Sequence, residues 1–302
     1  MDNSILLSIC IPTYNRAPYI KVSLERILLH IKDFAGIVEI LVSDNCSPDN
    51  TYEVINTLIK EGNPIKYNRN SENLGMDGNF SYCFTNATGK YVWVLGDDDY
   101  LVQGALKKII DILKYDEYGL IHLSTARNKI GSEKFSCVKN FLNEININIT
   151  FISGNIVNRD AVNRVDFNNY TGTLLTQLPV YLNASIHAKK NIIVYDELLE
   201  RSLDGVTNGG YNIFQVFITN YLDILKEFRG IIGFQWYEIQ KYKLCRSFLW
   251  GWMCVLLVDR NHGLRFKTDN WLKIFISKYW YEPYFYFLLL LLSKKKLLKA
   301  LQ

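Results

Sequence analysis

Three consecutive aspartates, Asp97, Asp98 and Asp99, follow the apolar run Tyr91–Leu95 after a single glycine. Adjacent carboxylates repel one another by roughly 1 kcal/mol or more per close pair near a surface, and a bound divalent cation removes that repulsion. Because side chains alternate along an extended segment, Asp97 and Asp99 face one side of the chain and Asp98 the other. The cluster therefore predicts a Mg²⁺ or Mn²⁺ site with Asp97 and Asp99 as ligands, since these ions prefer hard oxygen atoms. The alternative interpretation is a solvated acidic turn that caps the following helix.

Two other polar clusters also follow apolar runs. The segment Pro12–Arg16 comes after Leu6–Ile11, and Ser43–Asn45 comes after Val38–Val42. Asp44 in the second cluster is either a turn-forming residue or a carboxylate that accepts a hydrogen bond from a nucleotide base or ribose. The residue type alone favours neither interpretation.

Two further features have both a structural and a ligand-binding interpretation. Tyr14 either packs within the fold or stacks on a base. The segment Asn73–Asn79 is either a turn with a helix cap or, through Gly75 and Gly78, a place where the backbone approaches a phosphate closely.

These clusters need elements that bring them together, and the first 120 residues contain an alternation of strands and helices. The predicted strands are Leu6–Ile11, Val38–Val42, Ile65–Tyr67 and Tyr91–Leu95, and the predicted helices are Pro18–His30, one opened by Ser47 and Pro48, and Asp77–Asn86. Such alternation implies a largely parallel sheet covered by helices on both faces. Ligands of these sheets bind beyond the carboxyl ends of the strands, so we expect the clusters at one edge.

The periodic pattern weakens after about residue 120. Phe151–Val157 is predicted as a strand, and Leu174–Ala188 and Tyr211–Phe228 are predicted as helices. Near residue 240 the composition shifts to Trp, Phe, Tyr, Leu and Lys. We therefore expect a large α/β domain followed by a helical, aromatic-rich C-terminal region.

Composition excludes several classes of protein. The 302 residues are 49% apolar and 21% charged, which is typical of a globular chain rather than a disordered one. The net charge of +4 is too small a surplus to indicate a nucleic-acid partner. The six cysteines form no C-x-x-C pair, so we expect reduced thiols in a cytoplasmic protein. The four histidines are too scattered for a zinc cluster. Residues 1–4 are polar and lead directly into a predicted strand, so we expect no signal peptide.

Four segments, taken in order, resemble the motifs of family 2 glycosyltransferases with the GT-A nucleotide-sugar-binding fold. They are Ser8–Arg16, Glu39–Thr51, Asn73–Gly75 and Gly89–Asp99. The similarity covers about the first 120 residues and is greatest to abequosyltransferase-like and rhamnosyltransferase-like members of O-antigen and capsule pathways. It implies an α/β fold with a mostly parallel central sheet.

The resemblance also implies roles for individual residues. The acidic cluster, Asp97 to Asp99, is the catalytic DXD motif, with Asp97 and Asp99 binding the metal ion. The residues implied in donor binding are Pro12, Thr13, Tyr14, Asn15, Arg16, Asp44, Asn73, Gly75, Asp97 and Asp98. One departure is Gly96, which stands where many members have the first Asp of a D-x-D-D motif.

A second departure concerns the general base. Inverting members usually have a Glu-Asp pair on a helix in the second half of the chain, but the comparable segment Thr173–Tyr181 contains no acid. Asp166 and Asp196 are the remaining candidates, with Glu197 and Asp204 nearby in the sequence.

The resemblance implies metal-assisted, inverting transfer of a hexose or deoxyhexose. The donor would be a nucleotide-diphosphate sugar, and the acceptor a hydroxyl of a lipid-linked glycan in surface polysaccharide biosynthesis. We expect a GT-A domain at 1–235, with a donor half at 1–120 and an acceptor half at 121–235, and a helical region at 236–302. The alternative function is a catalytically inactive nucleotide-sugar-binding or scaffold protein of this fold. A dinucleotide-dependent oxidoreductase is disfavoured because no G-x-G-x-x-G follows the first strand.

The C-terminal region also suggests a membrane partner. Tyr284–Leu292 is apolar throughout, but nine helical residues reach only about 13 Å, too short for a bilayer. Residues 281–302 hold four lysines and one glutamate, a net charge of +3. We expect peripheral attachment to the inner face of the cytoplasmic membrane, the alternative being a helix docked in the protein's own core.

Overall fold

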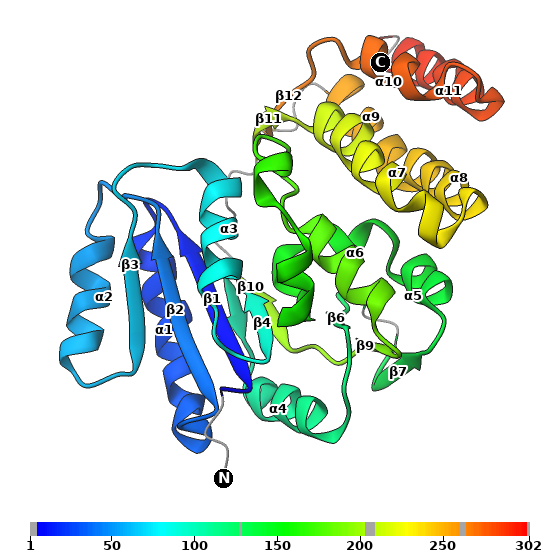
Figure 1. Ribbon diagram of the computed structural model, residues 1–302. Helices are drawn as coiled ribbons and strands as arrows, with labels where there is room; N and C mark the ends of the chain where they lie inside the picture. Colours follow the sequence, from blue (N-terminus) through cyan, green and yellow to red (C-terminus); the bar gives the residue numbers. More distant parts are fainter. Residues whose placement is uncertain (1–4, 127–128, 203–208, 260–263, 301–302) are drawn as a thin grey trace. The chain divides into compact units, whose positions relative to one another are not determined.

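A computed structural model describes residues 5–126, 129–202, 209–259 and 264–300 (Figure 1). The chain forms two compact units, Met1–Asp204 and Gly205–Gln302. The division falls earlier in the chain than the shift in composition near residue 240.

The first unit is built on an eight-stranded sheet with the order β3-β2-β1-β4-β8-β6-β9-β7. Strands β1 to β4 run parallel to their neighbours among themselves, whereas β8 is antiparallel to both β4 and β6, and β7 is antiparallel to β9. The mostly parallel sheet is therefore confirmed. The strands are β1 Leu7–Thr13, β2 Val38–Asp44, β3 Ile65–Arg69, β4 Tyr91–Val94, β6 Leu120–Leu123, β7 Ser132–Phe135, β8 Asn155–Asn158 and β9 Asn191–Val194. A separate two-stranded ribbon pairs β5 Asp99–Leu101 with β10 Leu199–Arg201.

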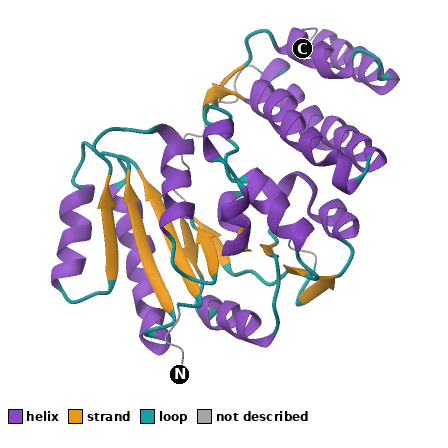
Figure 2. Ribbon diagram, viewed as in Figure 1, coloured by secondary structure: helices purple, strands orange, loops and turns teal. Residues whose placement is uncertain are grey.

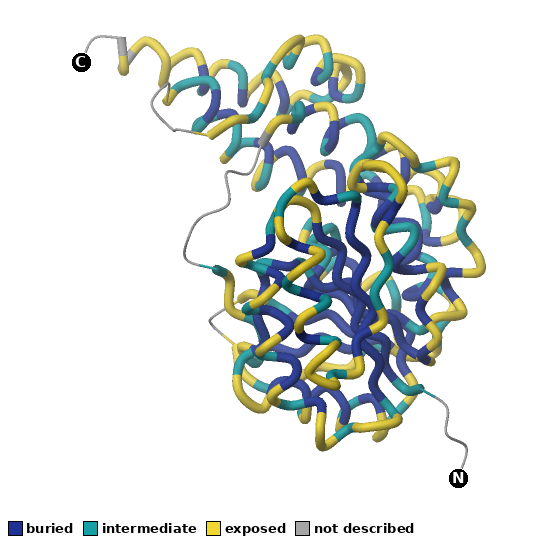
Figure 3. The backbone as a smooth tube through the Cα atoms, turned by 90° about the vertical axis from the view of Figure 1, so that its left-hand side faces the viewer, coloured by how far each residue is buried: buried dark blue, intermediate teal, exposed yellow. Residues whose placement is uncertain are grey.

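Helices cover both faces of this sheet (Figure 2). On one face, the alternate residues Leu7, Ile9 and Ile11 of β1 belong to the same buried cluster as Ile20 and Leu24 of α1. The six inner strands of the sheet are buried almost throughout (Figure 3), as expected for a sheet covered on both sides, whereas the edge strands β3 and β7 are largely accessible. The helices of this unit are α1 Ala17–Ile31, α2 Thr51–Lys60, α3 Gly75–Asn86, α4 Ala105–Tyr115, α5 Val138–Ile145 and α6 Leu178–His187, with short 3-10 turns η1 Lys32–Phe34, η2 Asn146–Thr150, η3 Ile152–Gly154, η4 Arg159–Arg164 and η5 Phe167–Tyr170.

Two local predictions were wrong. The helix after β2 begins at Thr51, not at Ser47, because the Ser47 hydroxyl accepts the backbone N–H of Asn15 instead of capping a helix. The segment predicted as a strand from Phe151 contains a 3-10 turn, and strand β8 starts only at Asn155. In both cases a contact with a distant segment overrides the local pattern.

The second unit is helical and rich in aromatic side chains, as predicted. Its core includes Phe275 and Phe285, whose rings stack at 5.5 Å between centroids with an interplanar angle of 5°. The elements are β11 Gly209–Asn212, the π-helices η6 Gln215–Asn220 and η7 Leu244–Leu249, α7 Tyr221–Ile232, α8 Phe234–Lys243, α9 Trp250–Leu257, β12 Arg265–Lys267, α10 Trp271–Tyr279 and α11 Pro283–Ala300. The predicted helix Tyr211–Phe228 is thus divided among a strand, a π-helix and the start of α7. Among the described residues, no helix combines the length and apolarity needed to span a bilayer.

One buried histidine makes the stability of the first unit depend on pH. His122 lies within β6, and its Nδ1 is 2.9 Å from Oδ1 of Asn155. Burial lowers the pKa of His122 to about 4. The unfolded chain binds a proton below about pH 6.5, so this residue favours folding above that pH and its contribution is lost as the pH falls toward about 4.

We therefore expect the free energy of unfolding to fall between about pH 7 and about pH 4.5 by an amount that includes ~2–3 kcal/mol from His122. In H122Q this part of the difference should vanish, even if the variant is less stable at both pH values. Urea denaturation at the two pH values measures it. H187Q, at an exposed histidine, is the matched control and should retain the full difference. An H122Q profile parallel to that of the wild type would contradict the assignment.

Candidate functional site

The polar loops after β1, β2 and β4 and the turn before α3 meet at the carboxyl edge of the sheet. Thr13, at the end of β1, donates its hydroxyl to Oδ2 of Asp97 at 2.7 Å. Asn45, after β2, donates its Nδ2 to the carbonyl oxygen of Gly75 at 3.1 Å. Neighbouring parallel strands end side by side, so segments far apart in the sequence come into hydrogen-bond contact.

The three aspartates lie in different surroundings. Asp97 is buried and accepts hydrogen bonds from Thr13 and from Nη1 of Arg16, the latter at 2.7 Å. Burial raises the pKa of Asp97 to about 7, and the Arg16 guanidinium opposes this shift. Asp98 accepts Nη2 of the same guanidinium at 3.0 Å. Its side chain is 19% exposed, against 3% for Asp97, so Asp98 is the more accessible carboxylate.

Asp99 is held on the other side of the cluster. It accepts the hydroxyl of Ser153 at 2.6 Å and lies 3.7 Å from Nε of Arg201, a residue that the sequence did not indicate. Burial raises the pKa of Asp99. The backbone N–H of Gly96 also donates to the Ser153 hydroxyl, at 2.8 Å.

Gly96 precedes the acidic cluster and lies beside the Ser153–Asp99 hydrogen bond. A Cβ atom at this position would lie 3.0 Å from Oδ2 of Asp99 and 3.2 Å from Oγ of Ser153. Both distances are tighter than ordinary contacts, so a residue with a Cβ atom here would require Asp99 and Ser153 to shift by a few tenths of an ångström.

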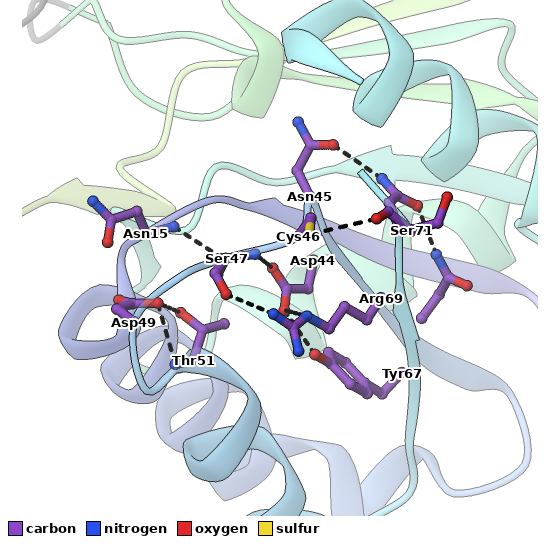
Figure 4. Close-up of polar contacts among 12 residues, drawn as sticks. Asn15, Asp44, Asn45, Cys46, Ser47, Asp49, Thr51, Tyr67, Arg69 and Ser71 are labelled. Atoms are coloured by element: carbon purple, nitrogen blue, oxygen red, sulfur yellow. Dashed lines mark hydrogen bonds and ion pairs between the residues drawn. The ribbon is translucent and has the colours of Figure 1, made fainter. Parts of the chain in front are cut away.

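Asp44 is buried in the loop that follows β2 (Figure 4). One carboxylate oxygen accepts the backbone N–H of Ser47 at 2.8 Å, and the other accepts the Tyr67 hydroxyl at 2.7 Å and lies 3.6 Å from Nε of Arg69. Burial and this carboxylate raise the pKa of Tyr67. In this state Asp44 fixes the loop conformation, which corresponds to the first of its two interpretations.

The loops after β1 and β2 each contain a residue with a positive φ, and hydrogen bonds join the two loops. Asn15 has φ 55° and Cys46 has φ 63°, a region that side chains other than glycine enter at a cost. The Asn15 N–H donates to Oγ of Ser47 at 2.9 Å (Figure 4). The carboxylate of Asp49 accepts the N–H of Ala17 at 3.0 Å. The first and second loops therefore form one unit. Tyr14 at its surface is 43% exposed.

The carboxamide of Asn45, which the sequence did not mark as a site residue, organises the turn before α3. Its Nδ2 donates to Oδ1 of Asn73 at 2.8 Å, and its Oδ1 accepts the N–H of Leu74 at 2.9 Å. Gly75 has φ 72° and nothing within 4 Å of where a Cβ would stand, so its glycine is required by backbone conformation rather than by crowding. The exposed backbone at Asn73 and Gly75 is consistent with close approach of a ligand.

Asp77 is an acid that the sequence suggested only as a helix cap. It is buried in the first turn of α3, and its carboxylate accepts the N–H of Leu174 at 2.9 Å and that of Thr176 at 3.4 Å. Burial raises its pKa. Asp77 therefore reaches the segment in front of α6, which has no acid of its own. An acid in the first turn of a helix is also typical of an ordinary helix cap, so this contact could not be expected from the sequence.

The two acids proposed from sequence as candidate bases lie elsewhere. Asp166 is exposed and accepts the N–H of Asn168. The ring of the adjacent Phe167 stacks on Phe84, which lies about 13 Å along α3 from Gly75 at ~1.5 Å per residue. Asp196 pairs with Lys108, which lowers the pKa of Asp196. Neither contacts the acidic cluster, and Asp204 lies outside the described residues.

Metal ions are not held by a closed protein cage in the part of the chain that the structure describes. No group of three or more His, Cys, Asp or Glu side chains is arranged there as a metal site.

The ion pair between Arg16 and Asp97 can be measured directly. Removing either partner leaves the other with an unbalanced charge, so R16Q and D97N should be coupled in a double-mutant cycle. We expect a coupling energy of ~1–3 kcal/mol, because Asp97 is buried and Arg16 is mostly buried. Urea denaturation in EDTA gives the four free energies, and strictly additive losses would rule out the coupling.

Three comparisons place the chain among known proteins. Residues 8–172, more than half of the chain, match the family described as Glycosyl transferase family 2. Abequosyltransferase RfbV of Salmonella typhimurium is 45% identical over 103 residues, which are 34% of this chain and 31% of that protein. GalNAc(5)-diNAcBac-PP-undecaprenol beta-1,3-glucosyltransferase of Campylobacter jejuni is 39% identical over 108 residues, 34% of this chain and 33% of that protein. The similarity thus spans only about a third of the length of these relatives.

Solved structures resemble this one in fold at low sequence identity. S. aureus TarS 1-349 in complex with UDP-GlcNAc gives a TM-score of 0.67 at 15% identity, covering 90% of this chain and 80% of that chain. The mannosyltransferase PcManGT from Pyrobaculum calidifontis, in complex with GDP-Man and Mn²⁺, gives 0.55 at 14% identity, covering 98% and 86%. These similarities confirm the GT-A fold predicted from the sequence.

Proposed function

The chain belongs to glycosyl transferase family 2, and from this membership we propose that it transfers a sugar from a nucleotide-diphosphate sugar to a hydroxyl group of a glycan acceptor. The observation that carries the proposal is the convergence of four loops around the acidic cluster at the carboxyl edge of the sheet. In parallel α/β sheets this edge is where ligands bind.

We assign the donor to these loops. The exposed ring of Tyr14 is available to stack on the base, beside the loop that Asp44 holds in shape. The backbone of Asn73 and Gly75, at the start of α3, suits the diphosphate, because helix N-termini favour anions and glycine permits close approach. Arg16 supplies a guanidinium next to the acids, and Pro12, Thr13 and Asn15 shape the same loop.

The residues present fit a divalent cation of the Mg²⁺ or Mn²⁺ type. Mg²⁺ is commonly held by one or two carboxylates together with substrate phosphates, so a site without three protein ligands is suitable. Asp98 is the best ligand of the three aspartates, since its carboxylate is the more exposed, with Asp97 and Asp99 as the inner members of the cluster. When bound, the ion would offset the negative charge that develops on the departing diphosphate.

The proton of the acceptor hydroxyl needs a base. As the acceptor oxygen bonds to the anomeric carbon, the bond from that carbon to the diphosphate breaks and the hydroxyl proton leaves. We propose Asp77 as its acceptor, because this carboxylate lies at the segment where inverting relatives are expected to carry their acid. Burial raises its pKa, which makes it a stronger base. Attack from the face opposite the diphosphate inverts the anomeric centre.

We extend the proposal to the acceptor and its location. One relative is named as acting on an undecaprenol-linked glycan and another as an abequosyltransferase. The undecaprenol-containing name supports a lipid-linked acceptor, and we propose surface polysaccharide biosynthesis at the cytoplasmic side of a membrane as the setting.

The proposal is tested by incubating the protein with UDP-, GDP-, dTDP- and CDP-linked sugars and Mn²⁺ and measuring the release of free nucleotide. We expect the protein to release free nucleotide from one of these donors, and EDTA should stop this release. D98N should lose at least about a hundredfold in turnover, as expected when an ion that stabilises the leaving group is weakened. D166N, at an exposed aspartate, is the matched control. Tight, metal-dependent binding of a nucleoside diphosphate without turnover of any donor would indicate the inactive binding protein instead.

D77N separates catalysis by Asp77 from a purely structural role. Asparagine retains an oxygen that accepts the Leu174 N–H, so the fold should persist. We expect kcat to fall by about 10²–10⁴-fold while the Kd for the nucleoside diphosphate, measured by calorimetry, changes little. Unchanged kcat with a lowered melting temperature would show that Asp77 only clamps the segment before α6.

A further inference from the structure

Helix α11 exposes a second apolar stripe in addition to the one it buries. Phe285, Leu288 and Leu292 face the core of the C-terminal unit with exposures of 8% or less, whereas Phe287 is 60% and Leu290 is 65% exposed. At about 100° per residue, the two sets lie on opposite sides of the helix. The exposed stripe continues through Lys294 to Leu297, which is 64% exposed.

Helix α10 and the residue that follows it show the same arrangement. Phe275 and Tyr279 are fully buried, but Leu272, Ile276 and Trp280 are 41%, 46% and 61% exposed and recur every four residues. Recurrence at that spacing places them along one face of the helix. Two helices of one unit therefore each bury one apolar stripe and expose another.

The charge around these stripes is strongly positive. Residues 271–300 contain six lysines and one acidic residue, Glu282, and Glu282 is paired with the buried Lys241. Lys295 and Lys296 lie over the rings of Trp250 and Trp271 rather than beside a carboxylate. Of these lysines, Lys278 pairs with Asp223 and Lys299 with Asp259. Within the described ranges, no carboxylate lies in ion-pair distance of Lys294, Lys295 or Lys296, so these three carry unpaired positive charge.

We propose that the exposed stripes of α10 and α11 form a docking face for a bilayer that contains anionic phospholipid. Apolar and aromatic side chains next to lysines match the layered chemistry of a lipid surface, in which acyl chains lie below phosphate groups. Trp280 and Tyr286, both at least half exposed, are residue types that favour the interface. A second copy of the chain fits less well, because a two-fold contact would bring lysines against lysines.

This inference deepens the proposed function, since a lipid-linked acceptor lies at such a surface, but its test measures binding and not transfer. The test is co-sedimentation of the full chain with phosphatidylcholine vesicles, with and without phosphatidylglycerol, at low and high salt. The wild type should bind the anionic vesicles, and more weakly at high salt.

F287S/L290S should lower the partition coefficient on anionic vesicles by at least about tenfold, at roughly 0.8 kcal/mol per buried CH₂ lost. K294Q/K295Q/K296Q should lower it as well and flatten its salt dependence. I231S, at an apolar residue of α7 that is 63% exposed, is the matched control and should bind like the wild type. Far-UV circular dichroism and a cooperative thermal transition like those of the wild type show that the variants are folded.

The inference is overturned if the wild type fails to bind anionic vesicles at low salt, or if F287S/L290S sediments like the wild type. It is also overturned if analytical ultracentrifugation shows a dimer that this double variant abolishes, because the stripes then cover each other. A chain that binds anionic vesicles but releases nucleotide from no donor would support the docking face and contradict the transferase activity. The two proposals can therefore fail separately.

Discussion

The contact of Arg16 with Asp97 and Asp98 is the interaction on which the site depends. A buried carboxylate needs a counter-ion or must remain protonated, and the loop after β1 supplies one to the loop after β4, 81 residues away. The two strands are neighbours in the sheet, so the contact closes the carboxyl edge from one side. The other loops are then attached in turn, Asn15 to Ser47 and Asn45 to the turn before α3.

Three adjacent acids are tolerated because each has a different set of partners. Asp97 is enclosed by Thr13 and Arg16, Asp99 by Ser153 and Arg201, and Asp98 shares Arg16 while retaining part of its surface. The repulsion expected from the sequence is thus reduced before any cation arrives. A ligand that attracts Arg16 would uncover both Asp97 and Asp98, so the guanidinium and an incoming cation are alternatives at the same carboxylates.

The sequence was sufficient for the strands of the first 95 residues and for the edge at which their polar loops meet, because buried runs and loop composition are local signals. It was insufficient where a contact with a distant segment determines the local conformation or the partner of a side chain. Ser47 resembles a helix cap but bonds to Asn15, and Asp77 resembles one but bonds to the segment before α6. The exposures of Asp97, Asp98 and Asp99 also depend on Arg16 and Ser153, which no spacing rule connects to them. The helices of the second half were harder because π-helical turns interrupt their period.

The contact of Asp77 with Leu174 and Thr176 bears on how such a protein can be recombined. The family match ends at residue 172, which is a natural point at which to join this part of the chain to the remaining part of a relative. A junction there would separate a buried carboxylate from the two backbone N–H groups that satisfy it. An exchangeable module therefore has to include the segment up to α6 together with α3. A junction that preserves this contact lies after the start of α6 rather than at the end of the family match.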